Sequence, residues 1–362
     1  MKLRVIVATL LMIIPLSMYA QMEQLKGKLI NKETGEPVPF ANVVLPGTTH
    51  GTSTDSDGYF SIGYTDLMKE LSFKISAVGF ETVDIPIGGA VEAASHGELL
   101  VYIRPMVYTV GDVDVFGKSM VYRKLLRQAV DAIPDNYIVQ PYNYVGSFVE
   151  KSITPNREHF RNTQVVIYNK VGYKRMSAPE LYQSESYRFN SAERSFKPVS
   201  AYDALTLMDE ILSADIIKAP RNVLDESIND EYTFSDNGIV ELDGRKIQVI
   251  GFNVPEPTMA NVYYANVKSC KGEIYVDTLN KAVVKYTLSC EMEGTNYLGY
   301  NYVANNDAPT QLDLVVTYKP YEGRYILGVV SISAGNKRLE YITEAVETMN
   351  VEEIEGRQYI ER

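Results

Sequence analysis

Histidine, cysteine and tryptophan are scarce, since the 362 residues contain three histidines, two cysteines and no tryptophan. His50, His96 and His159 stand far apart, and none has a second histidine three or four positions away. The chain therefore lacks the H-E-x-x-H and H-x-x-E patterns of zinc peptidases, and it also lacks the G-x-S-x-G nucleophile elbow. We expect no catalytic residue, no metal site and no cofactor, and we expect that the protein is not an enzyme.

A surplus of positive charge is also absent. Lysine and arginine number 35 against 46 aspartates and glutamates, which gives a formal net charge of −11. Nucleic-acid binding requires a basic face, and attraction to anionic lipid requires a polybasic segment. The charge therefore argues against both kinds of partner.

Long hydrophobic runs are missing except at the N-terminus. Lys2 and Arg4 precede an apolar run from Val5 to Leu16, and Ala20 offers a small residue before a cut at Gln21. This pattern predicts a signal peptide over residues 1–20, because an uncleaved anchor needs about 20 apolar residues. No cysteine follows the run to carry a lipid. We expect an exported protein in the periplasm or at the outer membrane, with no transmembrane segment after cleavage.

Tyrosine, in contrast, is abundant at 27 residues and suits half-exposed strands. Residues 23–105 contain short alternating segments separated by turn residues such as Gly35 and Pro37, and no helical period of useful length. Short strands at regular spacing predict a β-sandwich over residues 21–105.

A helix is expected after a linker at residues 106–118. Ser119 could cap it, Val121, Leu125, Ala129 and Ile133 recur every four residues, and Pro134 would end it. The helix opens a second domain, residues 119–345, with one further helix over 201–214. An acidic tail follows at residues 346–362, as a final strand or a free end.

The rest of the second domain alternates with a period of two. Residues 272–288, GEIYVDTLNKAVVKYTL, read as a hairpin, and residues 319–325, KPYEGRY, read as another. The predicted fold class is mainly β: the sandwich is followed by a curved, half-barrel-like antiparallel sheet with one or two helices.

Centring the first hairpin near residue 280 places Cys270 and Cys290 almost opposite each other on neighbouring strands. Opposed residues have Cβ atoms about 4.5–5.5 Å apart, which is close to disulfide geometry. Export to an oxidising compartment favours a disulfide, and two buried free thiols are the alternative. A bridge here would be structural.

Two stretches could bind a ligand. Residues 47–64, GTTHGTSTDSDGYFSIGY, lack the lysine of a phosphate-binding loop, and Phe60 and Asp66 occupy positions where a calcium loop needs glycine and glutamate. We therefore predict that Asp55 to Gly58 closes a β-hairpin.

The second stretch, NYLGYNYVANN, contains three tyrosines that could stack against a sugar or peptide. Ordinary cross-strand packing is the simpler interpretation. These tyrosines are Tyr297, Tyr300 and Tyr302.

The N-terminal motifs resemble a known family. Residues 34–37 (TGEP), 39–43 (PFANV), 47–48 (GT), 51–60 (GTSTDSDGYF) and 76–82 (SAVGFET) recur in the order and spacing of the carboxypeptidase-regulatory-like domain of exported Gram-negative proteins. The resemblance implies a transthyretin-like β-sandwich without catalysis of its own, often found ahead of TonB-dependent receptor barrels. The segment after residue 120 has neither the length nor the pattern of such a barrel, and its hairpins weakly resemble the curved sheet of periplasmic lipoprotein carriers.

Three functions remain as hypotheses. The first is a non-enzymatic binding or assembly module of the cell envelope that contacts protein or glycan. The second is a periplasmic carrier whose curved sheet encloses an acyl chain or lipid, and a long apolar groove in the second domain would favour it. The third is a hydrolase, because carboxylates are plentiful although no pair stands out.

Overall fold

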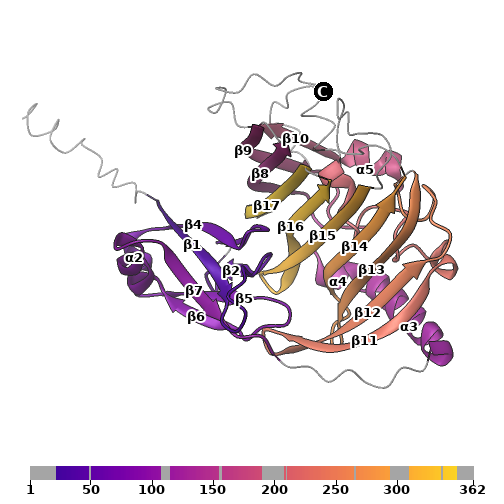
Figure 1. The fold of residues 1–362 in the computed structure, drawn as a ribbon, viewed down its shortest axis with the longest axis horizontal. Coiled ribbons are helices and arrows are strands. Elements are labelled where there is room, and N and C mark those ends of the chain that lie inside the picture. The colour runs from indigo at the N-terminus through magenta and orange to yellow at the C-terminus, as the bar shows by residue number, and fades with distance from the viewer. Residues whose placement is uncertain are drawn as a thin grey trace, which may run out of the picture.

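The structure is a computed structural model of the full chain. It describes residues 22–48, 50–106, 115–154, 157–189, 208, 210–264, 266–293, 310–335 and 337–348. The predicted signal peptide, most of the predicted linker, Tyr297, Tyr300 and Tyr302, and residues 349–362 of the predicted tail lie outside these ranges. The molecule is mainly β, as the sequence predicts, with two small N-terminal sheets followed by one large sheet (Figure 1).

The N-terminal part is a sandwich of two sheets around its own core. One sheet has the order β4 (Tyr59–Tyr64), β1 (Glu23–Asn31), β7 (Leu99–Ile103), and the other has the order β3 (Gly51–Ser53), β2 (Asn42–Val44), β5 (Ser72–Ser76), β6 (Val83–Pro86). β1 and β7 run parallel, and the remaining pairs run antiparallel. Apolar side chains from both sheets are buried between them, including Leu29, Val43, Phe73 and Ile75.

Ten antiparallel strands form the large sheet of the second domain. Its spatial order is β10, β9, β8, β17, β16, β15, β14, β13, β12, β11. The strands are β8 (Tyr142–Thr154), β9 (Arg157–Asn169), β10 (Glu185–Phe189), β11 (Thr233–Leu242), β12 (Arg245–Val254), β13 (Val267–Asp277), β14 (Val283–Met292), β15 (Thr310–Tyr321), β16 (Arg324–Ala334) and β17 (Lys337–Thr348). Residues 346–348 of the predicted tail therefore continue the last strand.

Both predicted hairpins of this sheet are confirmed. β13 and β14 pair around residue 280, where the Asp277 carboxylate accepts from the Leu279 amide at 2.8 Å. β15 and β16 pair up to Tyr321 opposite Arg324. Glu322 and Gly323 between them both have positive φ, at 46° and 77°, which is the backbone that a two-residue hairpin turn requires.

The two faces of the large sheet differ in burial. On β14, Tyr286, Leu288 and Cys290 are buried, whereas Lys285, Thr287 and Ser289 between them are half-exposed. Strand side chains alternate between faces, so the first set defines one face, which we call the inner face. The second set defines the outer face.

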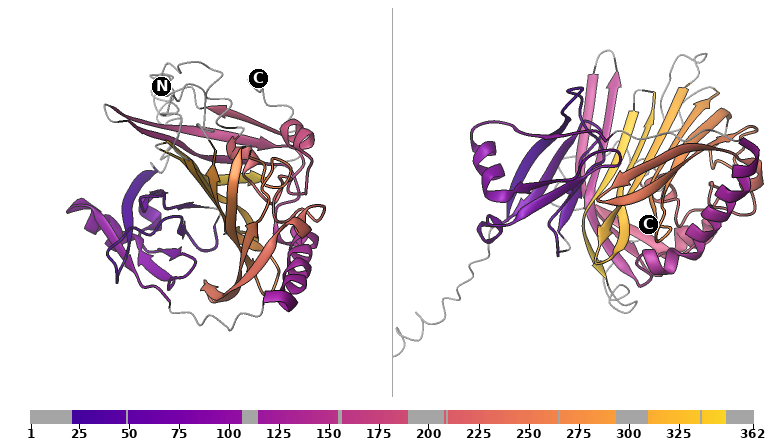
Figure 2. Two further views of the ribbon diagram at one scale, coloured as in Figure 1. Left: turned by 45° about the vertical axis from the view of Figure 1, so that its right-hand side comes forward. Right: turned by 90° about the horizontal axis from the view of Figure 1, so that it is seen from below.

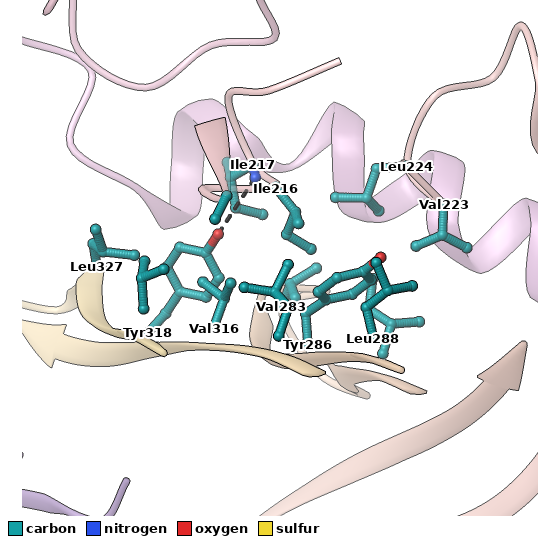
Figure 3. Close-up of a cluster of buried hydrophobic side chains, with 14 of the residues drawn as sticks. Ile216, Ile217, Val223, Leu224, Val283, Tyr286, Leu288, Val316, Tyr318 and Leu327 are labelled. Carbon is teal, nitrogen blue, oxygen red and sulfur yellow. Dashed lines mark hydrogen bonds between the residues drawn. The ribbon is translucent and has the colours of Figure 1, made fainter. Parts of the chain in front are cut away.

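The inner face is covered by α3 (Val115–Asp131), α4 (Ile133–Asn136) and residues 210–225. Ile216, Ile217 and Leu224 lie over Tyr286 and Tyr318 of the sheet (Figure 3). The Ile217 amide donates to the Tyr318 hydroxyl at 3.3 Å. α5 (Ala178–Ser184) is the remaining helix of this part for which the described residues give bounds, and Ser177 and Glu180 form its capping box.

Two helix predictions need correction. A helix, α2 (Ile87–Ser95), follows Pro86 in the sandwich, although no helix was predicted there. Pro86 removes one donor before the first turn, and Ile87 and Ala90 are buried. α3 begins at Val115, so Ser119 lies inside the helix and does not cap it. α3 ends before Pro134, as predicted, and of the predicted helix over 201–214 the described residues 208 and 210–213 are helical.

The sandwich docks against the outer face at β15, β16 and β17 (Figure 2). Polar contacts cross the junction. They include Arg338 to Ser56 Oγ (2.5 Å), the Ser56 amide to Glu340 (3.3 Å), Lys319 Nζ to Gly51 O (3.0 Å), Lys151 to Asp57 (3.5 Å) and Lys74 to Asp243 (3.2 Å). The last of these pairs reaches the turn between β11 and β12, so the sandwich also contacts that end of the sheet.

Candidate functional site

A polar groove crosses the outer face of β11, β12, β13 and β14. Its volume is about 580 Å³. Its polar lining comes from outward-facing side chains at neighbouring positions of the four strands: Thr233, Ser235, Asn237, Asn253, Lys271, Glu273, Thr287 and Ser289. We call this the outer groove.

Two glycines shape the floor of the outer groove. Gly251 on β12 lies against Ser235 and Asn237, and a side chain there would collide with them. Gly272 on β13 lies against the backbone of Thr287 and the ring of Phe252. Glycine allows such close approach because it has no Cβ. The missing side chain of Gly251 leaves space in the outer groove, whereas Gly272 shares the inward direction of Cys270 and Ile274 and leaves space for the Phe252 ring.

Hydrogen bonds fix the wall of the outer groove. Glu273 accepts from Asn237 Nδ2 at 2.8 Å and from the Tyr275 hydroxyl at 2.6 Å. The Glu273 amide donates to Thr287 Oγ1 at 3.1 Å. Ser289 Oγ donates to Asp313 at 2.6 Å. Because its polar groups are held in place, the wall presents hydroxyl and amide groups at defined positions.

Charge in the outer groove is balanced. Lys271 is exposed and Glu273 is half-buried. Lys285, just beyond the groove on β14, lies over the Tyr275 ring at 5.2 Å. Burial lowers the pKa of Lys285 and raises that of Tyr275. The outer groove therefore offers both donors and acceptors without a strong net charge, which suits a polar, uncharged ligand surface.

A second polar cluster lies buried at the inner face. Lys218 bonds to Glu185 and to the Tyr142 hydroxyl (2.9 Å), and it pairs with Asp215 at 3.2 Å. The three charged side chains are 1–2% exposed. The Tyr318 hydroxyl donates to Asp215 at 2.7 Å. The surrounding charges raise the pKa of Lys218 against the effect of its burial. Since solvent cannot reach it, we regard this cluster as structural.

Cys270 and Cys290 are joined by a disulfide across β13 and β14, with Cα atoms 4.2 Å apart. Both are buried in the inner-face core. The two cysteines share that face with Ile274, Val276, Tyr286 and Leu288, as the alternation predicts.

The histidines lie apart in the fold. The His50 ring contacts Gly63 O at 2.6 Å, and His96 is exposed at the end of α2. His159 belongs to β9, and its side chain is outside the description. Over the described ranges, no group of three histidine, cysteine, aspartate or glutamate residues could hold a metal ion.

The stretch at residues 47–64 forms a turn, but not a hairpin. Asp55 accepts from the amides of Asp57 (3.0 Å) and Tyr59 (2.8 Å), and Gly58 has φ of 80°. The prediction of a turn is confirmed, whereas the prediction of a hairpin is wrong because β3 and β4 belong to different sheets. The turn instead contacts the large sheet through Ser56.

Sequence reasoning missed two buried lysines and one half-buried lysine. Lys218, Lys285 and Lys319 stand within largely apolar segments, DIIKAP, AVVKYTL and VVTYKPY. A lysine in such a segment is a signal that its charge is either paired or facing a cavity, and that signal was available from the sequence.

Within the part of the chain that the structure describes, no helix is long and apolar enough to cross a membrane.

Comparison with known proteins identifies the N-terminal domain. Residues 25–96 match the model of the CarboxypepD_reg-like domain, which confirms the resemblance seen in the motifs. The chain is 31% identical over 120 residues to TonB-dependent receptor SusC of Bacteroides thetaiotaomicron, covering 32% of this chain and 11% of the receptor. It is 42% identical over 55 residues to a TonB-dependent receptor of Formosa agariphila, covering 15% of this chain and 5% of that receptor. The chain thus spans about a tenth or less of these relatives.

Solved structures give weaker likenesses. A DUF1329 family protein from Desulfovibrio piger has 9% identity and a TM-score of 0.30, over 64% of this chain and 92% of that one. A LolA superfamily protein from Nitrosomonas europaea has 10% identity and a TM-score of 0.26, over 65% of this chain and 97% of that one. At these values neither likeness carries a functional argument.

Proposed function

We propose that this protein is a non-enzymatic, exported module of the cell envelope that binds or assembles with a protein or glycan through its outer groove. One observation favours this function over that of a lipid carrier: the inner face of the large sheet is filled by side chains.

Three features support a place in the envelope. The N-terminus has the pattern of a signal peptide. A disulfide is favoured in an oxidising compartment. The chain also shares sequence with two proteins named as TonB-dependent receptors. Together these support the periplasm or the outer membrane as its location.

The inner face argues against a lipid carrier. An acyl chain would need an apolar groove between the sheet and its covering helices. Instead, Ile216, Ile217 and Leu224 fill the space over Tyr286 and Tyr318 (Figure 3). Each of these five side chains is less than 5% exposed. A lipid could enter only if this segment moved away, which would expose a large part of the core.

The outer groove supports contact with a polar partner. Its serine, threonine and asparagine side chains can each donate and accept hydrogen bonds. Sugar hydroxyls and polar protein segments have matching chemistry. Glu273 is the one carboxylate that lines the outer groove, whereas glycoside hydrolysis uses a facing pair. Glu185 and Asp215 do lie close together, but both are buried around Lys218. These facts support a role without catalysis.

The test is to purify the mature protein from its native envelope and to analyse what accompanies it by mass spectrometry. We expect a stoichiometric protein or a glycan, and no lipid. Lipid in stoichiometric amount would instead establish the carrier.

The same purification with Asn253→Arg tests the outer groove, because Asn253 is exposed and lines it. We expect this variant to lose the partner by tenfold or more. Glu33→Arg, on an exposed turn of the sandwich, should retain it. If both variants retained the partner, the outer groove would not be the binding site.

A further inference from the structure

A smaller cavity of about 120 Å³ lies between the sandwich and the large sheet. Residues from β2, β5 and their flanking loops line one side, and residues of β14 and β15 line the other. Its polar lining is made of Asn42, Ser76, Lys285 and Thr317, and two phenylalanines, Phe40 and Phe80, belong to its apolar wall. We call this the junction cavity.

Lys285 supplies a positive charge to the junction cavity. Its Nζ has no hydrogen-bond acceptor among the residues that the structure describes, and it lies over the Tyr275 ring at 5.2 Å. The neighbouring carboxylate is Glu273, whose two oxygens accept from Asn237 and from Tyr275. The three donors of the ammonium group are therefore available to a ligand.

Neutral donors accompany this ammonium. The Thr317 hydroxyl oxygen accepts from the Val329 amide at 3.1 Å, which leaves its proton to donate. The Asn42 carbonyl oxygen accepts from Ser53 at 3.5 Å, which leaves its NH₂ group. Ser76 is 5% exposed, and its hydroxyl has no partner in the described part of the chain. The polar lining is thus rich in donors and has one cation.

Size and the apolar wall restrict the ligand further. A cavity of about 150 Å³ can hold benzene, so the junction cavity has room for about five non-hydrogen atoms. Phe40 is half-buried and Phe80 packs against the sandwich core. A ligand with one anionic end and a short hydrocarbon tail would match both parts of the lining.

We propose that the junction cavity is a binding site for a small free monocarboxylate of three or four carbons, with its carboxylate on Lys285 and its tail against Phe40 and Phe80. This site is distinct from the outer groove, although Lys285 and Thr287 are neighbouring outward positions on β14. Because the lining comes from both domains, the ligand would also contact both.

Electrostatics support this assignment. An ammonium group removed from water without a partner is costly, and a carboxylate in contact would offset that cost. Burial lowers the pKa of Lys285, with Glu273 opposing the shift. A bound carboxylate would act in the same direction as Glu273 and favour the charged lysine.

The test uses the mature full chain and three probes at equal ionic strength: sodium propionate, propionamide and sodium chloride. Binding is followed by amide chemical shifts in nuclear magnetic resonance spectra. We expect propionate to saturate with half-saturation below about 10 mM. Propionamide, which has the same shape without the charge, should bind at least tenfold more weakly, and chloride should cause no saturable shifts near Ser76 and Thr317.

Lys285→Met should weaken propionate binding at least tenfold, and Ser76→Ala should weaken it a few-fold. Lys271→Met is the matched control, since it removes an exposed lysine from the same face outside the junction cavity, and it should bind like the original protein. Saturation by propionamide equal to that by propionate would overturn the proposal. Unchanged binding by folded Lys285→Met and Ser76→Ala would overturn it as well.

Discussion

Arg338 on β17 donates a hydrogen bond to Ser56 Oγ at 2.5 Å, and this contact joins the large sheet to the turn between β3 and β4. The same arginine lies 3.6 Å from Asp57. The Ser56 amide donates to Glu340, two residues further along β17. A turn that is exposed in an isolated sandwich is therefore part of the contact between the two domains.

Arg338→Ala should weaken this contact. We expect a loss of about 1 kcal/mol, because the pair is partly exposed and one hydrogen bond to a charged group is removed. Hydrogen exchange of residues 51–60 should become about fivefold faster. Lys124→Ala, which removes an exposed charge on α3, should leave that exchange unchanged. Equal exchange in the two variants would show that Arg338 does not hold the domains together.

The disulfide predicts a defined result in a thiol assay. The denatured, unreduced protein should show no free thiol, and reduction should release two. The double substitution Cys270→Ala and Cys290→Ala should lower the free energy of unfolding by about 2–4 kcal/mol, since the bridge closes a loop of 20 residues. Circular dichroism is the suitable probe, because the chain has no tryptophan. Two thiols before reduction would contradict the prediction.

Local patterns account for what could be predicted. The hairpin at residues 272–288 was visible because turn residues separate two alternating strands, and alternation also placed Cys270 and Cys290 on one face. α2 was missed because the two glycines that follow Ile87 are poor helix formers, and its helix depends on burying Ile87 and Ala90 against the sandwich. Packing outweighed propensity in that segment.

Long-range arrangement could not be predicted in the same way. β8 pairs with β17, and the start of the second domain thereby meets its end. The Lys218 cluster unites side chains from β8, β10 and the segment before Asn222. The outer groove needs four strands in register. No residue spacing in the sequence predicts these groupings, because each depends on which strands become neighbours in the folded sheet.

Lys218→Met should be strongly destabilising, although methionine fits an apolar core. It would leave Glu185 and Asp215 buried without their cation. Removing one member of a buried charged group costs about 3–5 kcal/mol, measured as the free energy of unfolding in urea. Adding Glu185→Gln and Asp215→Asn to the same chain should recover more than half of that loss. A triple variant as unstable as Lys218→Met would indicate that packing, not charge, is responsible.

The buried Lys319 should make the free energy of unfolding depend on pH. Its Nζ donates to Gly51 O at 3.0 Å and to Thr343 O, and the side chain is 3% exposed. Burial lowers its pKa from 10.5 to about 7, with Glu344 opposing the shift. Between these two values the unfolded chain holds a proton that the folded chain has lost. The free energy of unfolding should therefore rise with pH in this window, by up to about 1.4 kcal/mol per pH unit.

The measurement is urea unfolding at pH 7.0, 7.75 and 8.5, which lies well below the pKa of about 10 of tyrosine in the unfolded chain. We expect a total rise of roughly 1.5 kcal/mol from Lys319 over this range, with a smaller contribution in the same direction from Lys285, whose pKa is also lowered. Lys319→Met should remove most of the rise, because methionine does not titrate. Lys246→Met, at an exposed position on β12, is the control and should retain it. If Lys319→Met kept the full rise of unfolding free energy with pH, Lys319 would be charged in the folded protein throughout this range. Its hydrogen bond to Gly51 would then not change with pH.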